Sequence, residues 1–570
     1  MKKLIAASLC IALALSLCAC RSLRSTAGDY SEVYAVIKKC QSENQLTIRN
    51  VAADYEVEAF SEARDDHSET NVQVDGIDEG DTIKTDGKYI YFIDGKSVSI
   101  YEAAGENSRR AGSVELGENV YVYNMYVSDG VLALITGSDG TDRSCTAVYY
   151  YDVSDPANAR LIASAGQDGW LMTSRLYDGR LYLVTSYYVE DEAVRTKPET
   201  YVPQLYLNGK ASLADGSCIS IMPETVSTCY TVAAAYDMKS GALAAHRAVL
   251  GADSTVYMNK TSLYLSAARV EHETLKTYKE SVYDVSECAD RQYTDIMKLS
   301  VPELTAEASG TVEGYLDSQF SMDEYNGALR VVTTSTPIYW SIYTDAALEL
   351  ESYKYDAERS VMSNNLYILD VELNMLSSVE GLAENEQVYS VRFDEGFVYF
   401  CTFRQVDPLF AADVSDPKSP KILSELKISG FSEYLHKWSD DRLFGLGNEA
   451  DEASGMTTGL KLVMFDTSDK AAVTVKNTLN LAEGSYTSAL YDHTALLISP
   501  ERSVIGFCTS DSYLLFSYSD ESGFEKRSET ALDDDGSYKR AVYVDSCAYI
   551  VDANGMIVLA LDSGELIATA

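Results

Sequence analysis

Basic residues, histidine and tryptophan are scarce in this 570-residue chain. Lysine and arginine total 46 against 87 acidic residues, which gives a formal net charge of −41. Phosphate binding needs concentrated positive charge, so the composition excludes a nucleic-acid partner and disfavours contact with anionic lipid headgroups. The five histidines show no H-E-x-x-H spacing, which disfavours a zinc enzyme.

Local catalytic signatures are absent as well. The chain has no G-x-S-x-G elbow and no glycine-rich phosphate loop, and Cys18 and Cys20 do not form a C-x-x-C motif. Active sites assembled from distant residues leave no such trace in a sequence. The sequence therefore leaves enzyme activity uncertain and favours a role without catalysis.

The amino-terminal stretch MKKLIAASLCIALALSLCACRS has the form of an export signal. Two lysines precede an apolar run, from Leu4 to Leu17, that is too short to span a bilayer comfortably. The sequence LCAC resembles a bacterial lipobox, which predicts removal of residues 1–19 and lipidation of Cys20; ordinary secretion is the alternative. No later run is long enough to cross a membrane. We therefore expect a protein on the outer face of the bacterial cytoplasmic membrane, held by its lipid anchor only, or a secreted one.

Residues 20–70 are expected to hold the anchor, one short helix and a linker. In AGDYSEVYAVIKKCQ, Asp29 or Ser31 is available as a helix cap, and the helix is expected to dock on the rest of the protein. The polar residues that follow are typical of a tether. One helical face carries the residues Tyr30, Val33, Tyr34 and Ile37.

From Thr82 onward, helical periodicity disappears and short alternating strands dominate. A turn pair such as Asp-Gly or Asn-Gly recurs before an alternating strand, as in SDGVLALIT and YNGALRVVT. Such pairs tolerate the positive φ that tight hairpins need. Nine copies of this marker begin near Asp86, Asp129, Asp178, Asn259, Asn326, Asp394, Asp440, Asp492 and Asp545.

A second signal follows the first: a strand that ends in aspartate, a polar turn and another strand, as in FAADVSDPKSPKILSEL. Each unit thus holds four antiparallel strands. Such units, repeated without helices, are typical of a β-propeller, because radial packing hides both faces of each sheet. We expect an all-β propeller over residues 71–570 with about eight blades, within a range of seven to nine, since propellers usually have four to eight. One marker would then belong to an insertion or an incomplete blade, and an array of β-sandwiches is the competing fold.

Several stretches resemble exported bacterial proteins with a C-terminal β-propeller domain that is distantly related to WD-repeat propellers. They include NVQVDGIDEGDTIKTDGKYIY, TFRQVDPLFAADVSDPKSP and ISGFSEYLHKW, and the run from Asn364 to Trp438 is the most specific. The resemblance extends over most of residues 71–500. It implies a propeller and export, and it implies no established activity, substrate or catalytic residue.

The stretch NVQVDGIDEGD places four carboxylates within seven residues, just before the first repeat. In one interpretation Val72 and Val74 alternate as a strand that completes the last blade and closes the ring, with the acids in the following turn. In the second the acids form a metal site, with calcium as the candidate. In the third, paired carboxylates act as acid and base. The four carboxylates belong to Asp75, Asp78, Glu79 and Asp81.

Eight cysteines follow Cys20, and most are expected to be unpaired because several lie in apolar strands. Cys218 and Cys229 flank a short segment of a long insertion and are a candidate disulfide. Arg392 and His436 lie at or near first strands, which line a propeller channel, so they are candidates for ligand contact there. Alternatively, Arg392 pairs with a carboxylate between blades and His436 caps a turn.

Two tyrosine-rich insertions interrupt the repeats, over about residues 188–230 and 337–363. Loops on a rigid scaffold commonly carry function, and aromatic side chains suit carbohydrate or protein surfaces. Tyr339, Trp340 and Tyr343 are therefore candidate contacts at the rim. The second insertion has a pattern that is also compatible with a short helix.

The leading hypothesis is a surface-anchored lipoprotein whose propeller binds a protein or a cell-envelope polymer through its rim loops. Its rival is an extracellular hydrolase or lyase with carboxylates in the central channel, and a purely structural envelope component is the third interpretation. An enzyme should gather several titratable side chains in one cleft, whereas a binding protein should present a broad aromatic rim. Apart from calcium, no cofactor is expected.

Overall fold

The computed structural model describes residues 29–44 and 67–570, apart from Glu69, Lys96, 118–119, 139–142, Asp191, Ala346, Glu349, 404–406, Ser429, 451–455 and 533–538. The predicted export signal and Cys20 lie outside the described residues. Strands dominate those residues, which contain a single α-helix, α2 (Ser31–Asn44). In this part of the chain, no helix combines the length and the apolar character that crossing a membrane requires.

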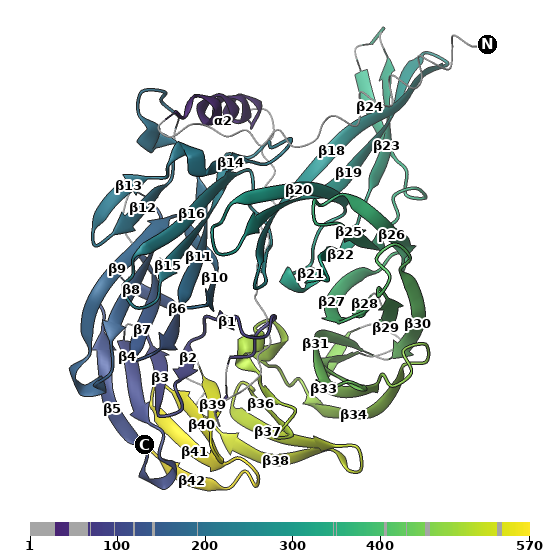
Figure 1. Cartoon of the computed structure of the whole chain (residues 1–570). Helices are drawn as coiled ribbons and strands as arrows, with labels where there is room; N and C mark the ends of the chain where they lie inside the picture. The colour runs from purple at the N-terminus through teal and green to yellow at the C-terminus, as the bar shows by residue number, and fades with distance from the viewer. Residues whose placement is uncertain are drawn as a thin grey trace.

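Nine sheets, numbered 1 to 9 in chain order, follow one another around a ring in the described part of the chain (Figure 1). Each contains a meander of four antiparallel strands that runs from the centre outward. Sheet 1 contains β2 (Ile83–Thr85), β3 (Tyr89–Asp94), β4 (Ser97–Glu102) and β5 (Arg109–Glu115), and sheet 2 contains β6 (Val120–Ser128), β7 (Val131–Ser138), β8 (Cys145–Asp152) and β9 (Arg160–Asp168). Sheet 3 contains β10 (Trp170–Tyr177), β11 (Arg180–Tyr188), β15 (Cys229–Asp237) and β16 (Leu243–Leu250). Sheet 4 contains β17 (Val256–Met258), β18 (Ser262–Glu280), β19 (Tyr283–Ser300) and β20 (Ala306–Glu313).

The second half of the ring follows the same plan. Sheet 5 contains β21 (Met322–Tyr325), β22 (Ala328–Ser335), β25 (Ser363–Leu369) and β26 (Met375–Leu382), and sheet 6 contains β27 (Gln387–Asp394), β28 (Phe397–Phe403), β29 (Asp407–Asp413) and β30 (Lys421–Ile428). Sheet 7 contains β31 (Phe431–Ser439), β32 (Arg442–Ala450), β33 (Thr457–Asp466) and β34 (Thr474–Glu483), and sheet 8 contains β35 (Leu497–Ser499), β36 (Val504–Cys508), β37 (Ser512–Ser519) and β38 (Gly523–Ala531). Sheet 9 contains β39 (Arg540–Val544), β40 (Cys547–Asp552), β41 (Gly555–Ala560) and β42 (Leu566–Thr569).

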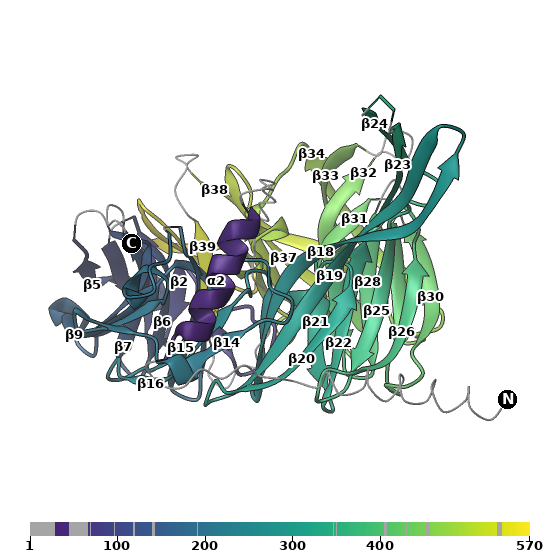
Figure 2. The same cartoon turned by 90° about the horizontal axis from the view of Figure 1, so that it is seen from above.

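Additional strands extend three of the sheets. The insertion into sheet 3 contributes β12 (Gln204–Leu207) and β13 (Lys210–Leu213) to sheet 2, and β14 (Ile219–Ile221) to sheet 3. The insertion into sheet 5 contributes β23 (Ile338–Asp345) and β24 (Leu350–Tyr355) to sheet 4, where β23 pairs with the far part of β19 and β24 pairs with β23. The far parts of β18 and β19 rise beyond the ring together with β23 and β24 (Figure 2).

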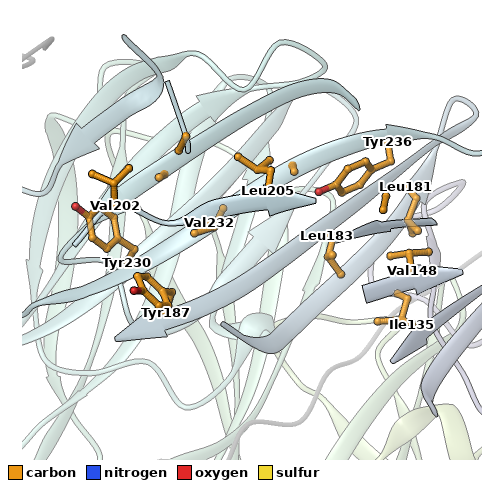
Figure 3. Packing of buried hydrophobic residues seen from close by; sticks show 14 of the residues in the cluster. Ile135, Val148, Leu181, Leu183, Tyr187, Val202, Leu205, Tyr230, Val232 and Tyr236 are labelled. Atoms are coloured by element: carbon orange, nitrogen blue, oxygen red, sulfur yellow. The ribbon is translucent and has the colours of Figure 1, made fainter. Parts of the chain in front are cut away.

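The core consists of nine hydrophobic clusters, and each cluster lies between two neighbouring sheets. Between sheets 2 and 3, for example, Ile135 and Val148 meet Leu181 and Leu183, and Tyr236 packs beside them (Figure 3). One cluster joins sheet 9 to sheet 1 and so closes the ring. This packing confirms the predicted ring and contradicts an array of separate sandwiches.

The sheet count and the way the ring closes differ from the expectation. The nine turn markers correspond to nine sheets, one more than the best estimate and the upper limit of the expected range. Sheet 9 consists entirely of carboxy-terminal strands, and neither Val72 nor Val74 lies in a strand. Because β39 to β42 already supply all four strands of sheet 9, Val72 and Val74 do not complete that sheet. The ring is closed by apolar packing between sheets 9 and 1.

Candidate functional site

Residues 67–68 and 70–81, here called the channel segment, cross the central channel of the ring. Figure 1 shows β1 (Asp78–Glu79) of this segment inside the ring, where it pairs with β10. The segment thereby joins inner parts of six sheets and the connections between them. Through the backbone, Ser68 N donates to Tyr543 O at 2.8 Å, Asp81 O accepts from Met125 N at 3.0 Å, and β1 pairs with Arg175 and Leu176 of β10. Through side chains, Asn71 Nδ2 donates to Tyr434 Oη and to His493 O at 3.2 Å each. Gln73 Nε2 donates to Gln319 O at 3.1 Å and to Met322 O at 3.3 Å.

The four carboxylates of NVQVDGIDEGD point to four different basic residues. Because the segment runs past one inner strand after another, each carboxylate meets its own partner, and no group of three metal-ligating side chains forms among the described residues. The structure therefore does not assemble the predicted calcium site. The pairs are Asp75 with Lys260 Nζ at 3.9 Å, Asp78 with Lys84 Nζ at 2.6 Å, Glu79 with Arg175 Nε at 3.0 Å and Asp81 with Arg540 Nε at 3.5 Å.

The Glu79–Arg175 pair is the most deeply buried of these. Glu79 is 2% exposed and Arg175 is 4% exposed. Burial raises the pKa of Glu79 to about 8, and the charge of Arg175 opposes that rise. Burial likewise raises the pKa of Asp81 to about 6, opposed by Arg540. Buried charges of this kind are tolerated only when each retains its partner, so the segment is held by a connected set of ion pairs.

Two cavities flank the channel segment. The larger, of about 330 Å³, is lined by the turn ends of inner strands, including Thr85 and Asp178, and by Lys84. The smaller, of about 250 Å³, is lined by the starts of inner strands, including Leu171 and Arg540. Small-molecule sites typically measure ~300–1,000 Å³, so the larger cavity reaches only the lower end of that range and the smaller one falls below it.

Arg392 and His436 lie on the first strands β27 and β31, as predicted. His436 is almost fully buried, and its Nδ1 atom lies 2.9 Å from the hydroxyl of Tyr434. Burial lowers the pKa of His436 well below its usual range, and the nearby charge of Arg392 contributes to the shift. His436 thus bonds a neighbour on its own strand, and it does not cap a turn.

Glu433 occupies an irregular position in the pairing of β31, between Ser432 and Tyr434. Irregularities of this kind redirect a side chain at the rim of a sheet. Burial and, to a lesser extent, the negative charge of Asp317 together raise the pKa of Glu433 to about 8. The channel therefore contains a second group of titratable residues, which sequence motifs did not reveal because Asp317 lies 116 positions away in the chain.

His493 provides a test of the buried channel environment. It is fully buried in the 3-10 helix η7 (His493–Ala495), and burial together with Arg175 lowers its pKa well below the ordinary value. Below about pH 6.5 the unfolded chain therefore binds a proton that the folded chain does not, and the free energy of unfolding should fall by up to ~1.4 kcal/mol per pH unit from this residue. In His493→Phe that part of the slope should disappear.

The measurement is denaturant unfolding of both proteins between pH 8 and pH 5. At pH 8 the histidine is neutral in both states, so the difference there reports only the change in packing. Equal slopes for the two proteins below pH 6.5 would contradict a neutral, buried His493.

The second insertion builds a separate surface. β18 and β19 contain 19 and 18 residues and extend well beyond sheet 4. There β23 pairs with β19 from Tyr283↔Asp345 to Asp290↔Ile338, and β24 pairs with β23. We call this four-stranded extension the projection. The alternating residues of the insertion thus form a hairpin, and the alternative of a short helix is wrong because both halves find strand partners.

One face of the projection is aromatic. Trp340 lies directly opposite Tyr355 in the pairing of β23 with β24, and its ring is 5.3 Å from that of His272. Tyr353, two residues from Tyr355 on the same strand, points to the same side. We call His272, Trp340, Tyr353 and Tyr355 the aromatic face.

The predicted rim contacts are divided between the two faces. Strand alternation places Trp340 on the aromatic face and turns Tyr339 and Tyr343 to the other side. Tyr343 packs edge-on against Tyr283 with ring centroids 6.0 Å apart, and the guanidinium of Arg359 lies 4.3 Å from the ring centroid of Tyr339. Of the three candidates, only Trp340 belongs to the aromatic face.

The first insertion folds against the amino-terminal helix. Val33 and Ile37 of α2 are buried in the cluster of sheets 2 and 3, and the ring of Tyr34 packs 5.5 Å from that of Tyr201. The side chain of Asp29 accepts a bond from Ser31 N at 3.0 Å and caps the helix. The predicted docked helix is confirmed.

The predicted disulfide is not formed. Cys218 directly precedes β14 and Cys229 begins β15, and β16 lies between these two strands. Two strand spacings amount to about 9.6 Å, which exceeds the Cα separation of about 7 Å that a disulfide can bridge. No disulfide joins any of the eight cysteines of the described residues.

Both insertions emerge from the same side of the ring. Each lies between the second and third strands of its sheet, and these connections all leave the meanders at the same end. Figure 2 shows the projection rising beyond the ring on this side, while α2 lies against the flank of the ring.

A closed ring of four-stranded antiparallel sheets, crossed by a short segment of chain, defines a β-propeller protein. This chain belongs to the β-propeller domain family, whose sequence model matches residues 67–562.

Two curated relatives are archaeal proteins described as uncharacterized. One, from Archaeoglobus fulgidus, is 29% identical over 568 residues, covering 85% of this chain and 81% of the relative. The other, from Methanocaldococcus jannaschii, is 27% identical over 519 residues, covering 79% and 74%. Solved structures similar to this chain include a functionally unknown protein from Desulfotomaculum acetoxidans, with 10% identity, a TM-score of 0.29 and coverage of 59% of this chain and 91% of that one. The Dos1 propeller is 9% identical with a TM-score of 0.30, covering 70% and 76%.

Proposed function

We propose that this protein is an exported, lipid-anchored binding scaffold with nine propeller blades, which holds a protein or a cell-envelope polymer on the aromatic face of its projection. The amino-terminal export pattern and Cys20 support the anchored location. The observation that carries the binding role is the clustering of His272, Trp340, Tyr353 and Tyr355 on one side of an extension that reaches beyond the ring.

Exposure of large aromatic side chains is costly unless it serves contact with another molecule. Tyr353 and Tyr355 are 67% and 59% exposed. Isolated surface aromatics are common, whereas a patch on one face marks an interaction site. Aromatic rings also supply large contact area with few rotatable bonds, which lowers the entropy cost of binding.

A binding role is better supported than a hydrolase or lyase acting in the channel. The acids of NVQVDGIDEGD are held by basic partners, and the channel segment occupies the space in which a polymer would have to lie. Asp317 and Glu433 keep an acid–base function open as the alternative.

The test compares two tryptophan variants of the intact protein. Trp340→Ala should reduce capture of partners from solubilised membranes by about tenfold or more, as expected for an aromatic hot spot. Trp170→Ala is the matched control, because Trp170 is an exposed tryptophan at the start of β10 and lies outside the projection. Capture is quantified by mass spectrometry of the bound proteins and by sugar analysis of the bound polymers. Equal capture by the two variants would remove the aromatic face as the binding surface.

A further inference from the structure

The outer edge of β24 is an open strand edge. In the described part of the chain, β24 ends its sheet and pairs only with β23. All six of its residues, LESYKY, are exposed, and the strand contains no proline. Such an edge offers a row of backbone N–H and C=O groups to another strand.

The other outer edges in the described part of the chain are interrupted or short; β13 and β14, which end sheets 2 and 3, contain only four and three residues. The outermost strand of each of the nine meanders pairs with its neighbour through an irregular register. The far part of β18, which forms the opposite edge of the projection, also contains such an irregularity, between Thr274 and Lys276. Bulges of this kind protect sheet edges from pairing with other chains. β24 pairs with β23 in a continuous register and lacks this protection.

We propose that β24 pairs antiparallel with β24 of a second copy of this chain, about a two-fold axis at Tyr353. The two projections would then form one continuous eight-stranded sheet. In this register Tyr353 faces its own copy, Glu351 faces Tyr355, and Ser352 faces Lys354. No like charges face each other, and the three pairings are of types that stabilise neighbouring strands.

Because β24 lies at the tip of the projection, two copies of this chain can pair through it while their acidic rings stay apart. Each copy has a formal charge of −41, and repulsion between such molecules opposes close contact of the rings. Pairing through the tips of two projections leaves the rings apart, and salt screens charges beyond about 10 Å at 0.1 M. The contact would cover exposed apolar side chains at the tip, which include Leu350 and Tyr353.

This association is expected to be weak and dependent on concentration. A single strand pair buries less than the ~1,200–2,000 Å² of a stable interface. The fraction of dimer should rise between low salt and about 0.5 M sodium chloride, because screening reduces the repulsion between the two acidic rings. The inference concerns the edge of β24 in the purified protein and does not depend on the binding role of the aromatic face.

The experiment is sedimentation equilibrium of the purified full chain and of variants at Tyr353. Tyr353→Lys and Tyr353→Glu each place like charges opposite one another on the two-fold axis, so each alone should weaken dimerisation by about tenfold or more. An equimolar mixture of the two variants should recover dimers, because the lysine of one copy then faces the glutamate of the other. Tyr121→Lys is the matched control, since Tyr121 is an exposed tyrosine on β6, and it should dimerise like the parent.

The outcomes separate clearly. Recovery of dimers in the mixture supports both the partner and the register. A parent chain that stays monomeric at all concentrations overturns the proposal, as does a dimer that neither Tyr353 variant weakens. Stronger dimerisation of Tyr353→Lys alone would place Tyr353 opposite Glu351 and contradict the register.

Discussion

Replacing Arg175 with methionine is expected to lower the free energy of unfolding by about 3–5 kcal/mol, one of the two largest effects predicted for a single change. The guanidinium is 4% exposed and joins the channel segment to two sheets. Its Nε atom pairs with Glu79 Oε1 at 3.0 Å, and Nη2 donates to Gln319 Oε1 at 2.6 Å. Methionine fills much of the volume but leaves the Glu79 carboxylate buried without its cation. Because burial raises the pKa of Glu79 to about 8, the measurement is denaturant unfolding at pH 9, where the carboxylate of the parent protein is ionised.

Two further variants isolate the buried charge from the loss of packing. Adding Glu79→Gln to Arg175→Met removes the stranded carboxylate, so the double variant should be more stable than Arg175→Met alone. Arg160→Met is the surface control, because Arg160 is 73% exposed in its pair with Asp152 and should change stability by only about 0–1 kcal/mol. A double variant no more stable than the single one would show that Arg175 acts through packing.

Asp168→Ala is expected to cost about 3 kcal/mol and to loosen the first insertion. Asp168 ends β9 and is fully buried. It accepts bonds from Arg143 Nε at 2.7 Å, Gln204 N at 2.6 Å and Tyr206 Oη at 2.7 Å. Gln204 and Tyr206 belong to β12 of the first insertion, and Arg143 also donates to backbone oxygens of that insertion. Without the carboxylate, three half-buried donors lose their acceptor, and Arg143 loses its counter-ion.

Limited proteolysis combined with unfolding measurements checks this prediction. Cleavage of Asp168→Ala should concentrate within residues 188–230 before the ring itself is digested, because the insertion is released first. Asp440→Ala is the control: Asp440 is fully exposed in its pair with Lys437, and little change is expected. Uniform cleavage around the ring would show that Asp168 stabilises the whole fold and not the insertion in particular.

The turn chemistry of the repeats allowed the ring to be predicted. Asp129, Asp178 and Asn326 adopt φ values of +49°, +49° and +52°, which is the conformation that the Asp-Gly and Asn-Gly markers require. Of the nine markers, only Asp492 falls outside the turn between the first and second strands, since it lies before β35. Each of the nine sheets carries one marker, so assigning one marker to an insertion gives eight blades, one fewer than the number of sheets.

Tyrosine is abundant in this chain, with 42 residues, and the structure shows how it is used in the core. The largest fully buried side chains are all tyrosines, among them Tyr126 and Tyr236. Several of their hydroxyls bond buried partners, such as Tyr126 to Ser174 Oγ at 2.9 Å and Tyr236 to Gly166 O at 3.0 Å. Tyrosine therefore packs in the core as a large apolar ring, and hydroxyl bonds of this kind offset part of the cost of burying its polar end.

The projection was only partly visible in the sequence. The tyrosine-rich pattern predicts a contact surface in the second insertion, but it does not reveal the partner strands β18 and β19, because their outer halves are polar and lack the apolar pattern of a buried strand. One usable signal was the interval between the markers at Asn259 and Asn326, which leaves room for two long strands. Tyr353, Tyr355 and His272 were missed because strand register, and not proximity in sequence, brings them beside Trp340.

The sequence by itself determined the strand pattern, the hairpin turns and the ring architecture, because these depend on period-two alternation and on residues that tolerate positive φ. Only the tertiary structure decided the number of sheets, the path of NVQVDGIDEGD through the channel and the division of Tyr339, Trp340 and Tyr343 between two faces. Local rules describe each strand and its turn. Ion pairs such as Glu79–Arg175, and the register of strands far apart in the chain, arise only when the ring closes and brings distant residues within bonding distance.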